Sequence, residues 1–215
     1  MKGSWRRWSR IVGVIVLLGL VCAVPAVRAA MLRTLGWMLV VDEPVGAVDI
    51  IVVPVWAGAA GAIDAADLVH GSIAGRIAVL AEPAKPADRE LIRRGVAYQD
   101  ETAQLAQLLR SLGIANVEVI PGAADGTHEE SHVLLSWCDQ RRFQSIVVVS
   151  APDHSRRVRR ALHRALRGHP TTAVVRSARY SSFDPDRWWT TRDGVRIEIV
   201  ELQKLLLDVV RHPIS

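Results

Sequence analysis

Cysteine is scarce in this chain of 215 residues, which contains only Cys22 and Cys138. Cys22 lies within an apolar run and Cys138 within a predicted helix, so we expect no disulfide inside the folded domain. The residues before Cys22 do not form a lipoprotein acylation motif, and we predict no lipid attachment there. Without a disulfide framework, the fold has to rest on a sizeable hydrophobic core.

Three glycine-containing signatures are also missing. The sequence has no Gly-x-Gly-x-x-Gly, no Gly-Lys-Ser/Thr and no Gly-x-Ser-x-Gly. Their absence argues against a dinucleotide-binding fingerprint, a P-loop nucleoside triphosphatase and the serine elbow of an α/β-hydrolase. We find neither an internal repeat nor a low-complexity tract.

The net charge of +5 is concentrated at the N-terminus. Five of the 27 Lys and Arg residues precede residue 29, and the other 22 balance 22 acidic residues. This balance removes the main support for nucleic-acid binding, which we do not expect. Residues 29–140 are acidic and residues 141–215 are basic. The two halves either attract each other within one domain or leave a basic pole for an anionic ligand or lipid headgroups.

Four basic residues precede an apolar run, Ile11–Val24, that extends to Arg28. The run is intermediate in length between a signal-peptide core and a membrane-spanning helix. We therefore predict that residues 1–28 are a cytoplasmic basic stub and transmembrane anchor, or else a cleaved signal peptide. The positive charges favour a single-pass protein of the plasma membrane, here the inner membrane, whose C-terminal domain is extracytoplasmic. Residues 29–47, with the apolar segment Met31–Val41, are predicted to be a stalk.

Residues 48–211 show the pattern of an α/β domain, in which short β-branched runs alternate with helical segments. The predicted strands are Val48–Val55, Arg76–Leu80, Val117–Ile120, the run from Gln144 to Ser150, and Thr172–Val175. The predicted helices are Ile63–His70, Gln99–Leu112, two that begin near Thr127 and Asp153, and Arg196–Val210. This alternation predicts a doubly wound, Rossmann-like parallel sheet of about five strands.

Several element ends carry recognisable signals. Gly113 is expected to end its helix as a C-terminal glycine. Thr127 and Glu130 are expected to form a capping box, and Asp153 to cap the next helix. The segment Glu82–Asp88 is expected to be a surface loop, and Tyr180–Gly194 an irregular segment.

Polar residues gather where predicted strands end and helices begin, which is where open α/β sheets bind ligands. An imidazole, carboxylates and a guanidinium that converge there could act as base, acid and anion clamp. We predict His154, Glu129 and Glu101 as catalytic residues, with Glu129 orienting His154. The predicted ligand-binding residues are Arg157, Ser150, Thr127 and Glu130. We predict no metal ion. Each charged residue, taken singly, could instead serve only the first turn of its helix.

Taken together, these motifs resemble the YdcF/SanA/ElyC-like family, a bacterial domain family of unsettled activity. The resemblance covers about residues 48–210 and rests on two motifs, Thr127-His-Glu-Glu130 and the strand followed by Ser150-Ala-Pro-Asp-His154-Ser-Arg-Arg157. Glu129, His154 and Arg157 match the family pattern, Glu101 looks like its acidic residue in the preceding helix, and a final helix carries Glu201 and Lys204. The sequence departs from the family at Val55–Ala57, Ala62 and Ala81–Pro83, and has Glu130 where asparagine is usual.

The resemblance implies an anchored extracytoplasmic domain that serves cell-envelope or peptidoglycan precursor metabolism. It would act on or bind a phosphate-bearing or lipid-linked ligand, as a hydrolase or a phosphoryl-transfer enzyme. S-adenosylmethionine is a possible cofactor by this resemblance alone, and protein partners are unknown. The departures favour an alternative, a non-catalytic module with a degenerate pocket. A further alternative is a partner-binding face on the arginine-rich helix that follows Asp153.

Overall fold

The structure of the chain, a computed structural model, describes residues 24–120 and 126–213. The apolar run predicted to cross the membrane lies, except for its last residue, outside the described residues, as do Cys22 and the loop 121–125. None of the described helices is long and apolar enough to span a membrane.

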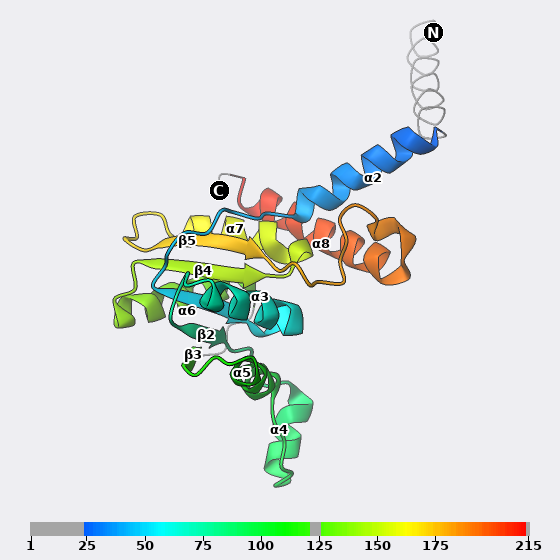
Figure 1. The fold of residues 1–215 in the computed structure, drawn as a ribbon. Helices are drawn as coiled ribbons and strands as arrows, with labels where there is room; N and C mark the ends of the chain where they lie inside the picture. Colours follow the sequence, from blue (N-terminus) through cyan, green and yellow to red (C-terminus); the bar gives the residue numbers. More distant parts are fainter. Residues whose placement is uncertain (1–23, 121–125, 214–215) are drawn as a thin grey trace, which may run out of the picture.

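A five-stranded, all-parallel sheet forms the centre of the domain (Figure 1). Its strand order is β3-β2-β1-β4-β5, which confirms the predicted α/β, Rossmann-like fold. The strands are β1 (Ile50–Pro54), β2 (Ile77–Leu80), β3 (Val117–Ile120), β4 (Ser145–Ser150) and β5 (Thr172–Ser177). Because β1 and β4 are almost wholly buried, their β-branched residues pack on both faces of the sheet.

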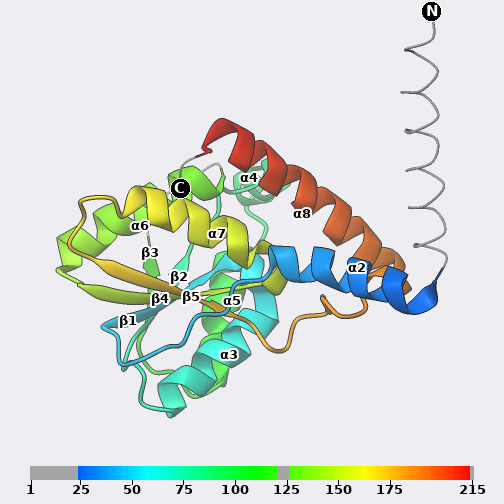
Figure 2. The ribbon, with the colours of Figure 1, turned by 90° about the horizontal axis from the view of Figure 1, so that it is seen from above.

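Two helical layers cover the sheet (Figure 2). On one face, α3 (Gly58–His70) and α5 (Glu101–Ser111) pack over Ile51, Val53 and Val147. On the other face, α6 (Thr127–Arg141) and α7 (Pro152–Ala165) pack over Val52 and Val148. Two short 3₁₀ turns, η1 (Val55–Ala57) and η2 (Trp188–Thr190), connect larger elements.

A third layer contains one helix from each end of the described chain. Helix α2 (Pro25–Leu39) and helix α8 (Arg192–Arg211) both contact α7, and Leu39, Trp188 and Leu205 form a small separate core. The apolar segment predicted as a stalk therefore belongs to a helix that packs on the domain. Gly36 of α2 makes this close approach possible, because an added Cβ would lie 2.8 Å from Trp188 Cδ1 and closer still to a backbone oxygen.

Several predicted element ends are corrected by the structure. Gly126, not Thr127, is the N-cap of α6, so the capping box predicted for Thr127 and Glu130 does not form. Ala151 is the N-cap of α7, because Pro152 suits the first helical position and places Asp153 inside the helix. Part of the predicted loop Glu82–Asp88 belongs to helix α4 (Pro86–Arg93). Gly113, with φ +89°, ends α5 as predicted.

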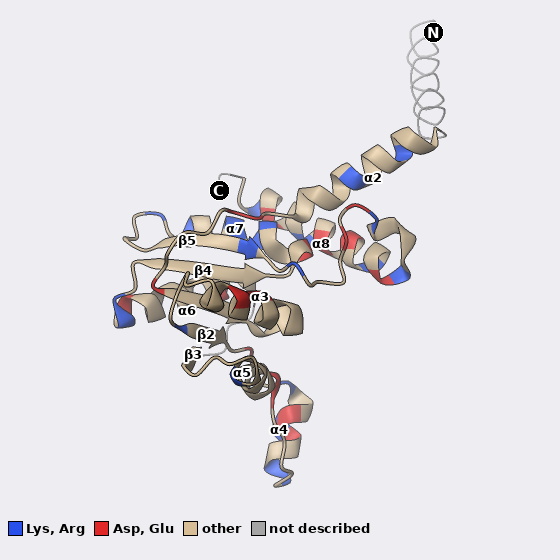
Figure 3. Ribbon diagram, viewed as in Figure 1, with Lys and Arg blue, Asp and Glu red and all other residues tan. Residues whose placement is uncertain are grey.

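The acidic and basic halves of the chain are joined by ion pairs (Figure 3). Arg159 of α7 contacts Glu43, Arg176 contacts Asp42, and the buried Asp64 contacts Arg179. In each pair the carboxylate comes from the acidic half and the arginine from the basic half. The charge asymmetry of the sequence is thus used, in part, for attraction within one domain.

Replacing Gly36 with alanine tests how tightly α2 is held. The new methyl group would force α2 away from residues 185 and 188, and overpacking of this kind costs about 1–3 kcal/mol. We expect a lower midpoint of thermal unfolding for the full chain in detergent, followed by circular dichroism. Gly46→Ala is the control, because an added Cβ there meets no atom within 4 Å. Equal midpoints for the two variants would show that α2 is not closely packed.

Candidate functional site

The candidate site lies at the carboxyl ends of β1 and β4, where the strand order reverses direction. Such a switch point is where open α/β sheets bind ligands. Trp56 follows β1 and His154 follows β4, and their ring centroids are 4.3 Å apart. The packing of β1 beside β4 therefore brings an indole against an imidazole from a distant part of the chain.

His154 is the centre of a polar network built from three helices. Its Nδ1 lies 3.2 Å from Glu201 Oε2 on α8, and its Nε2 lies 3.4 Å from the Thr127 hydroxyl on α6. Arg157, one turn further along α7, donates to Glu201 over 3.2 Å and also to the Thr127 hydroxyl. Lys204 donates to the other Glu201 oxygen over 2.7 Å. The network therefore exists only when α6, α7 and α8 are packed together.

The protonation states follow from burial and charge. Burial lowers the pKa of His154 despite the opposing effect of Glu201, so the imidazole is neutral at pH 7. Burial alone would raise the pKa of Glu201, but hydrogen bonds with His154 and Lys204 and the charge of Arg157 lower it to about 2. Glu201 is then a carboxylate and can only accept hydrogen bonds.

The Glu201 carboxylate favours one tautomer of the imidazole. We assign the proton to Nδ1, which faces the carboxylate, and the lone pair to Nε2. Arg157 Nη2 lies 2.7 Å from Nδ1 and 3.1 Å from Nε2, so the guanidinium contacts both ring nitrogens and the assignment depends on Glu201. The order hydroxyl, imidazole, carboxylate is one that can accept a proton at Nε2 and stabilise the resulting imidazolium.

A basic cleft of about 410 Å³ adjoins this network, and Thr127 and Arg157 line it directly. Its other charged and histidine side chains are Arg164, Lys204, Arg211, Glu129, Asp208, His128 and His212. The first turn of α6 opens onto it, and no side chain caps that helix terminus. Cationic side chains and the N-terminus of a helix both favour an anion.

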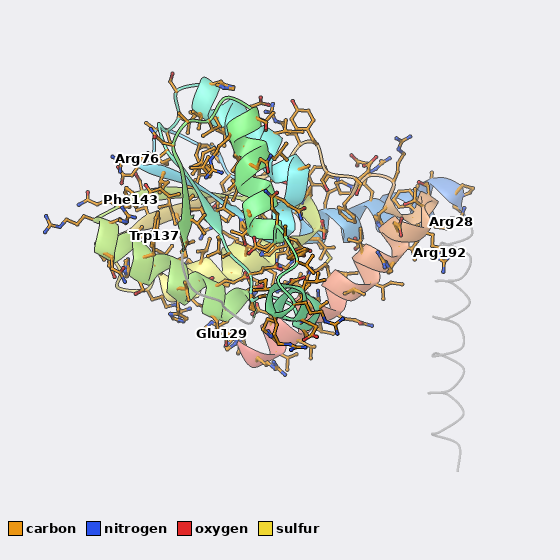
Figure 4. The ribbon with its side chains drawn as sticks, turned by 90° about the horizontal axis from the view of Figure 1, so that it is seen from below. Arg28, Arg76, Glu129, Trp137, Phe143 and Arg192 are labelled. Carbon is orange, nitrogen blue, oxygen red and sulfur yellow. The ribbon has the colours of Figure 1, made fainter. Side chains whose placement is uncertain are left out.

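Three of the predicted site residues, Thr127, His154 and Arg157, are brought together by the structure. Glu129 is exposed at the start of α6 (Figure 4) and lines the cleft. The carboxylate that contacts the His154 imidazole is Glu201, so the orienting role expected of Glu129 falls to Glu201.

The other predicted residues lie apart from the His154 network. Ser150 is fully buried and donates to the carbonyl of Ala151. Glu130 is buried beside Trp56. Burial raises the pKa of the Glu130 carboxyl group, and the nearby indole N–H of Trp56 lowers it by a smaller amount. The two groups do not form a hydrogen bond of ordinary geometry. Glu101 pairs with Lys85 and lines a separate cavity at the start of α3.

Sequence reasoning did not assign a role to Glu201 or Lys204, although both were noted in the final helix. It also missed His128 and His132, whose spacing of four residues places them on one face of α6. Their ring centroids are 4.7 Å apart, and His212 stacks on His128 at 5.8 Å. Within residues 24–120 and 126–213, however, no group of three or more His, Cys, Asp or Glu residues is placed to hold a metal ion.

Glu198, one turn before Glu201, is fully buried, and neither of its carboxylate oxygens has a hydrogen-bond partner in the described structure. Burial, with a smaller effect of Asp153, raises its pKa from 4.5 to about 7. The folded chain therefore holds a proton that the unfolded chain releases. This contribution to stability is complete below pH of about 4.5 and is lost as the pH rises through 7.

Glu198→Gln should remove this pH dependence. We expect the variant to unfold at a higher temperature than the unchanged chain at pH 8, corresponding to about 3 kcal/mol, and to differ by less than about 1 kcal/mol at pH 5. Asp193→Asn, whose side chain is 83% exposed in the first turn of α8, serves as the control. The measurement is the thermal midpoint of the full chain in detergent at both pH values. If the difference in thermal midpoint between the Glu198 variant and the unchanged chain were the same at pH 5 and pH 8, the assignment would be contradicted.

The sequence as a whole was compared with known proteins. No family model matches the chain, and no curated protein is significantly similar to it. The resemblance to the YdcF/SanA/ElyC-like family therefore rests on the short motifs given above and stays a prediction.

Proposed function

We propose that the chain is a membrane-anchored extracytoplasmic domain that binds a phosphate-bearing ligand in the basic cleft and uses His154 to act on it. The observation that carries the proposal is the juxtaposition of two features. A neutral imidazole held by a carboxylate contacts Thr127 and Arg157, and these two residues line a cleft that has four cationic side chains.

The cleft suits phosphate for two physical reasons. Arginine side chains present paired N–H groups that match the oxygens of a phosphate, and Lys204 and Arg211 add positive charge to the lining. The backbone N–H groups at the start of α6 provide donors without a competing side-chain cap. Glu129 and Asp208 offset part of the charge, and Asp208 is already occupied by Arg160 and Arg164.

The proposed chemistry is transfer of a phosphoryl group or hydrolysis of a phosphoester. His154 Nε2 would accept a proton from the attacking water or hydroxyl, and Glu201 would stabilise the imidazolium that forms. Arg157, which contacts the hydroxyl of Thr127, would stabilise negative charge that develops on the phosphoryl oxygens. The reaction class, rather than a particular substrate, is what this geometry supports.

The resemblance to the YdcF/SanA/ElyC-like family supports the cellular context of the proposal. It favours a role in cell-envelope or peptidoglycan precursor metabolism, with a lipid-linked precursor as ligand. S-adenosylmethionine belongs among the ligands to be tested for the same reason.

A non-catalytic binding module is the second candidate, and a specific observation favours it. The Arg157 guanidinium already contacts Glu201, Thr127 and His154, so less of its hydrogen-bonding capacity faces the cleft. In that case the chain would bind the same class of ligand without converting it. The two candidates differ in whether product forms.

Binding can be tested by the thermal midpoint of the full chain in detergent, followed by tryptophan fluorescence. The panel holds pyrophosphate, sugar nucleotides, a polyprenyl phosphate analogue and S-adenosylmethionine. A phosphate-bearing ligand at about 100 times its Kd should raise the midpoint by about 5–10 °C. Arg211→Gln should weaken binding about ten-fold, since it removes a cation from the cleft wall without disturbing the His154 network.

Arg196→Gln, an exposed position on the same helix, is the matched control for Arg211→Gln and should bind as the unchanged chain does. Loss of binding in both variants, or in neither, would show that the ligand does not occupy this cleft.

Catalysis is tested with His154→Gln, which keeps a polar side chain of similar size but cannot accept and return a proton. We expect release of phosphate from the bound ligand to fall about 100-fold or more, while the ligand still raises the thermal midpoint. Glu201→Gln should lower the rate as well, because the imidazolium loses its partner. Unchanged turnover in His154→Gln would sink the catalytic role, and ligand binding without any product would establish the non-catalytic alternative.

A further inference from the structure

A groove of about 790 Å³ separates α2 from α8, with α7 as its floor. Trp37 and Met38 of α2 and Leu205 and Val209 of α8 form its apolar walls, and Arg156 and Arg160 lie on α7. Figure 2 looks down on the face where α2 and α8 diverge. The groove is distinct from the basic cleft, because it lies on the other side of the α7–α8 contact, which Arg160, Arg164 and Asp208 form.

The apolar surface continues from the groove onto the exposed side of α8. Leu206 is 64% exposed and Val210 is 70% exposed, and the exposed Ile199 lies on the same face of α8. On α2, Leu35 and Met38 are exposed as well. Scattered exposed hydrophobic residues are ordinary, but a contiguous apolar patch on two adjoining helices marks an interaction surface.

Basic side chains border this apolar surface. Arg28 is exposed near the start of α2, and Figure 4 shows it near Arg192 at the start of α8. Arg156 donates to backbone carbonyls at the end of α2, so no carboxylate neutralises it in the described structure. Arg160 and Arg33 are paired with Asp208 and Asp186, and Arg164, which shares Asp208, lines the basic cleft instead. The positive charge beside the apolar surface therefore comes from Arg28, Arg156 and Arg192, and it complements anionic lipid headgroups.

The position of this surface in the chain identifies its partner. Helix α2 begins at Pro25, within the last residues of the segment 1–28 that we predict to be the membrane anchor. An anchor in the bilayer would keep α2 at a high effective concentration next to the membrane surface. Even a weak contact between α2 and the lipid would then be populated.

We propose that the α2–α8 face rests on the phospholipid surface, with its apolar residues at the level of the headgroups and its arginines facing lipid phosphates. The inference depends on the membrane anchor of the proposed function, and it adds an orientation. Leu207 and Lys204, which line the basic cleft, belong to the same helix α8. Docking of α8 would therefore place the cleft near the headgroup layer, where the phosphate of a lipid-linked ligand lies.

The test places a nitroxide at single positions of the full chain in nanodiscs that contain anionic phosphatidylglycerol. A Cys22→Ser background leaves the buried Cys138 as the only native thiol of the sequence. Labels are introduced with Leu206→Cys and Val210→Cys on α8, and with Ile92→Cys as a control at an exposed apolar position on α4. Collisions with oxygen, which is enriched in lipid, are compared with collisions with a water-soluble nickel chelate.

We expect positions 206 and 210 to report immersion of about 5–10 Å below the aqueous phase, as for an interfacial amphipathic helix, and position 92 to report water. Equal aqueous exposure at all three positions would overturn the proposal. Dipolar broadening between labels on two copies would also overturn it, because the face would then be covered by self-association.

A second pair of variants separates docking from the proposed ligand site. Leu206→Glu combined with Val210→Glu should abolish immersion, read from a label at Gln203, while pyrophosphate still raises the thermal midpoint. If immersion is observed but no phosphate compound binds, the docking surface stands and the proposed ligand site fails. If phosphate binds but the labels stay aqueous, the docking surface alone fails.

Discussion

The buried carboxylate of Glu201 is the interaction on which the rest of the site depends. A buried anion is costly unless it is fully paired, and Glu201 is paired with His154, Arg157 and Lys204. His154 and Arg157 lie on α7, whereas Glu201 and Lys204 lie on α8, so the attraction between them helps to fix how the last helix packs on α7. The same carboxylate also determines which nitrogen of His154 carries the proton. Packing of the C-terminal helix and the chemistry of the imidazole are therefore two consequences of one charge.

Helix α7 links this site to the rest of the molecule because its arginines point to different partners. Arg156 bonds to the carbonyls at the end of α2, Arg157 reaches Glu201, and Arg159 pairs with Glu43. Arg160 and Arg164 hold Asp208 of α8. An arginine-rich helix that could have been a partner-binding face is thus largely engaged within the chain.

The sequence predicted the sheet well and the boundaries of helices less well, for physical reasons. Buried parallel strands require continuous β-branched runs, and Val117–Ile120 was predicted with its observed limits. Helix starts depend on one residue each, and Thr127 was expected to cap α6 although its hydroxyl serves Arg157 instead. His154 and Arg157 could be predicted because they are three residues apart on one helix. Glu201 is 47 residues from His154, and nothing local in the sequence indicates that the two meet.

The ion pairs and hydrogen bonds of the cationic side chains also show which of these side chains are available to a ligand. Most cations of the basic half are paired with carboxylates of either half or bound to backbone carbonyls. Lys204 is half-exposed beside Glu201, and Arg211 lines the cleft without an ion pair in the described part of the chain. Both belong to the last two turns or so of α8, next to the uncapped start of α6. The positive potential available to an anion is therefore concentrated beside the residues Arg157 and Thr127, which contact His154. A phosphate drawn there by charge would arrive next to the imidazole that Glu201 orients.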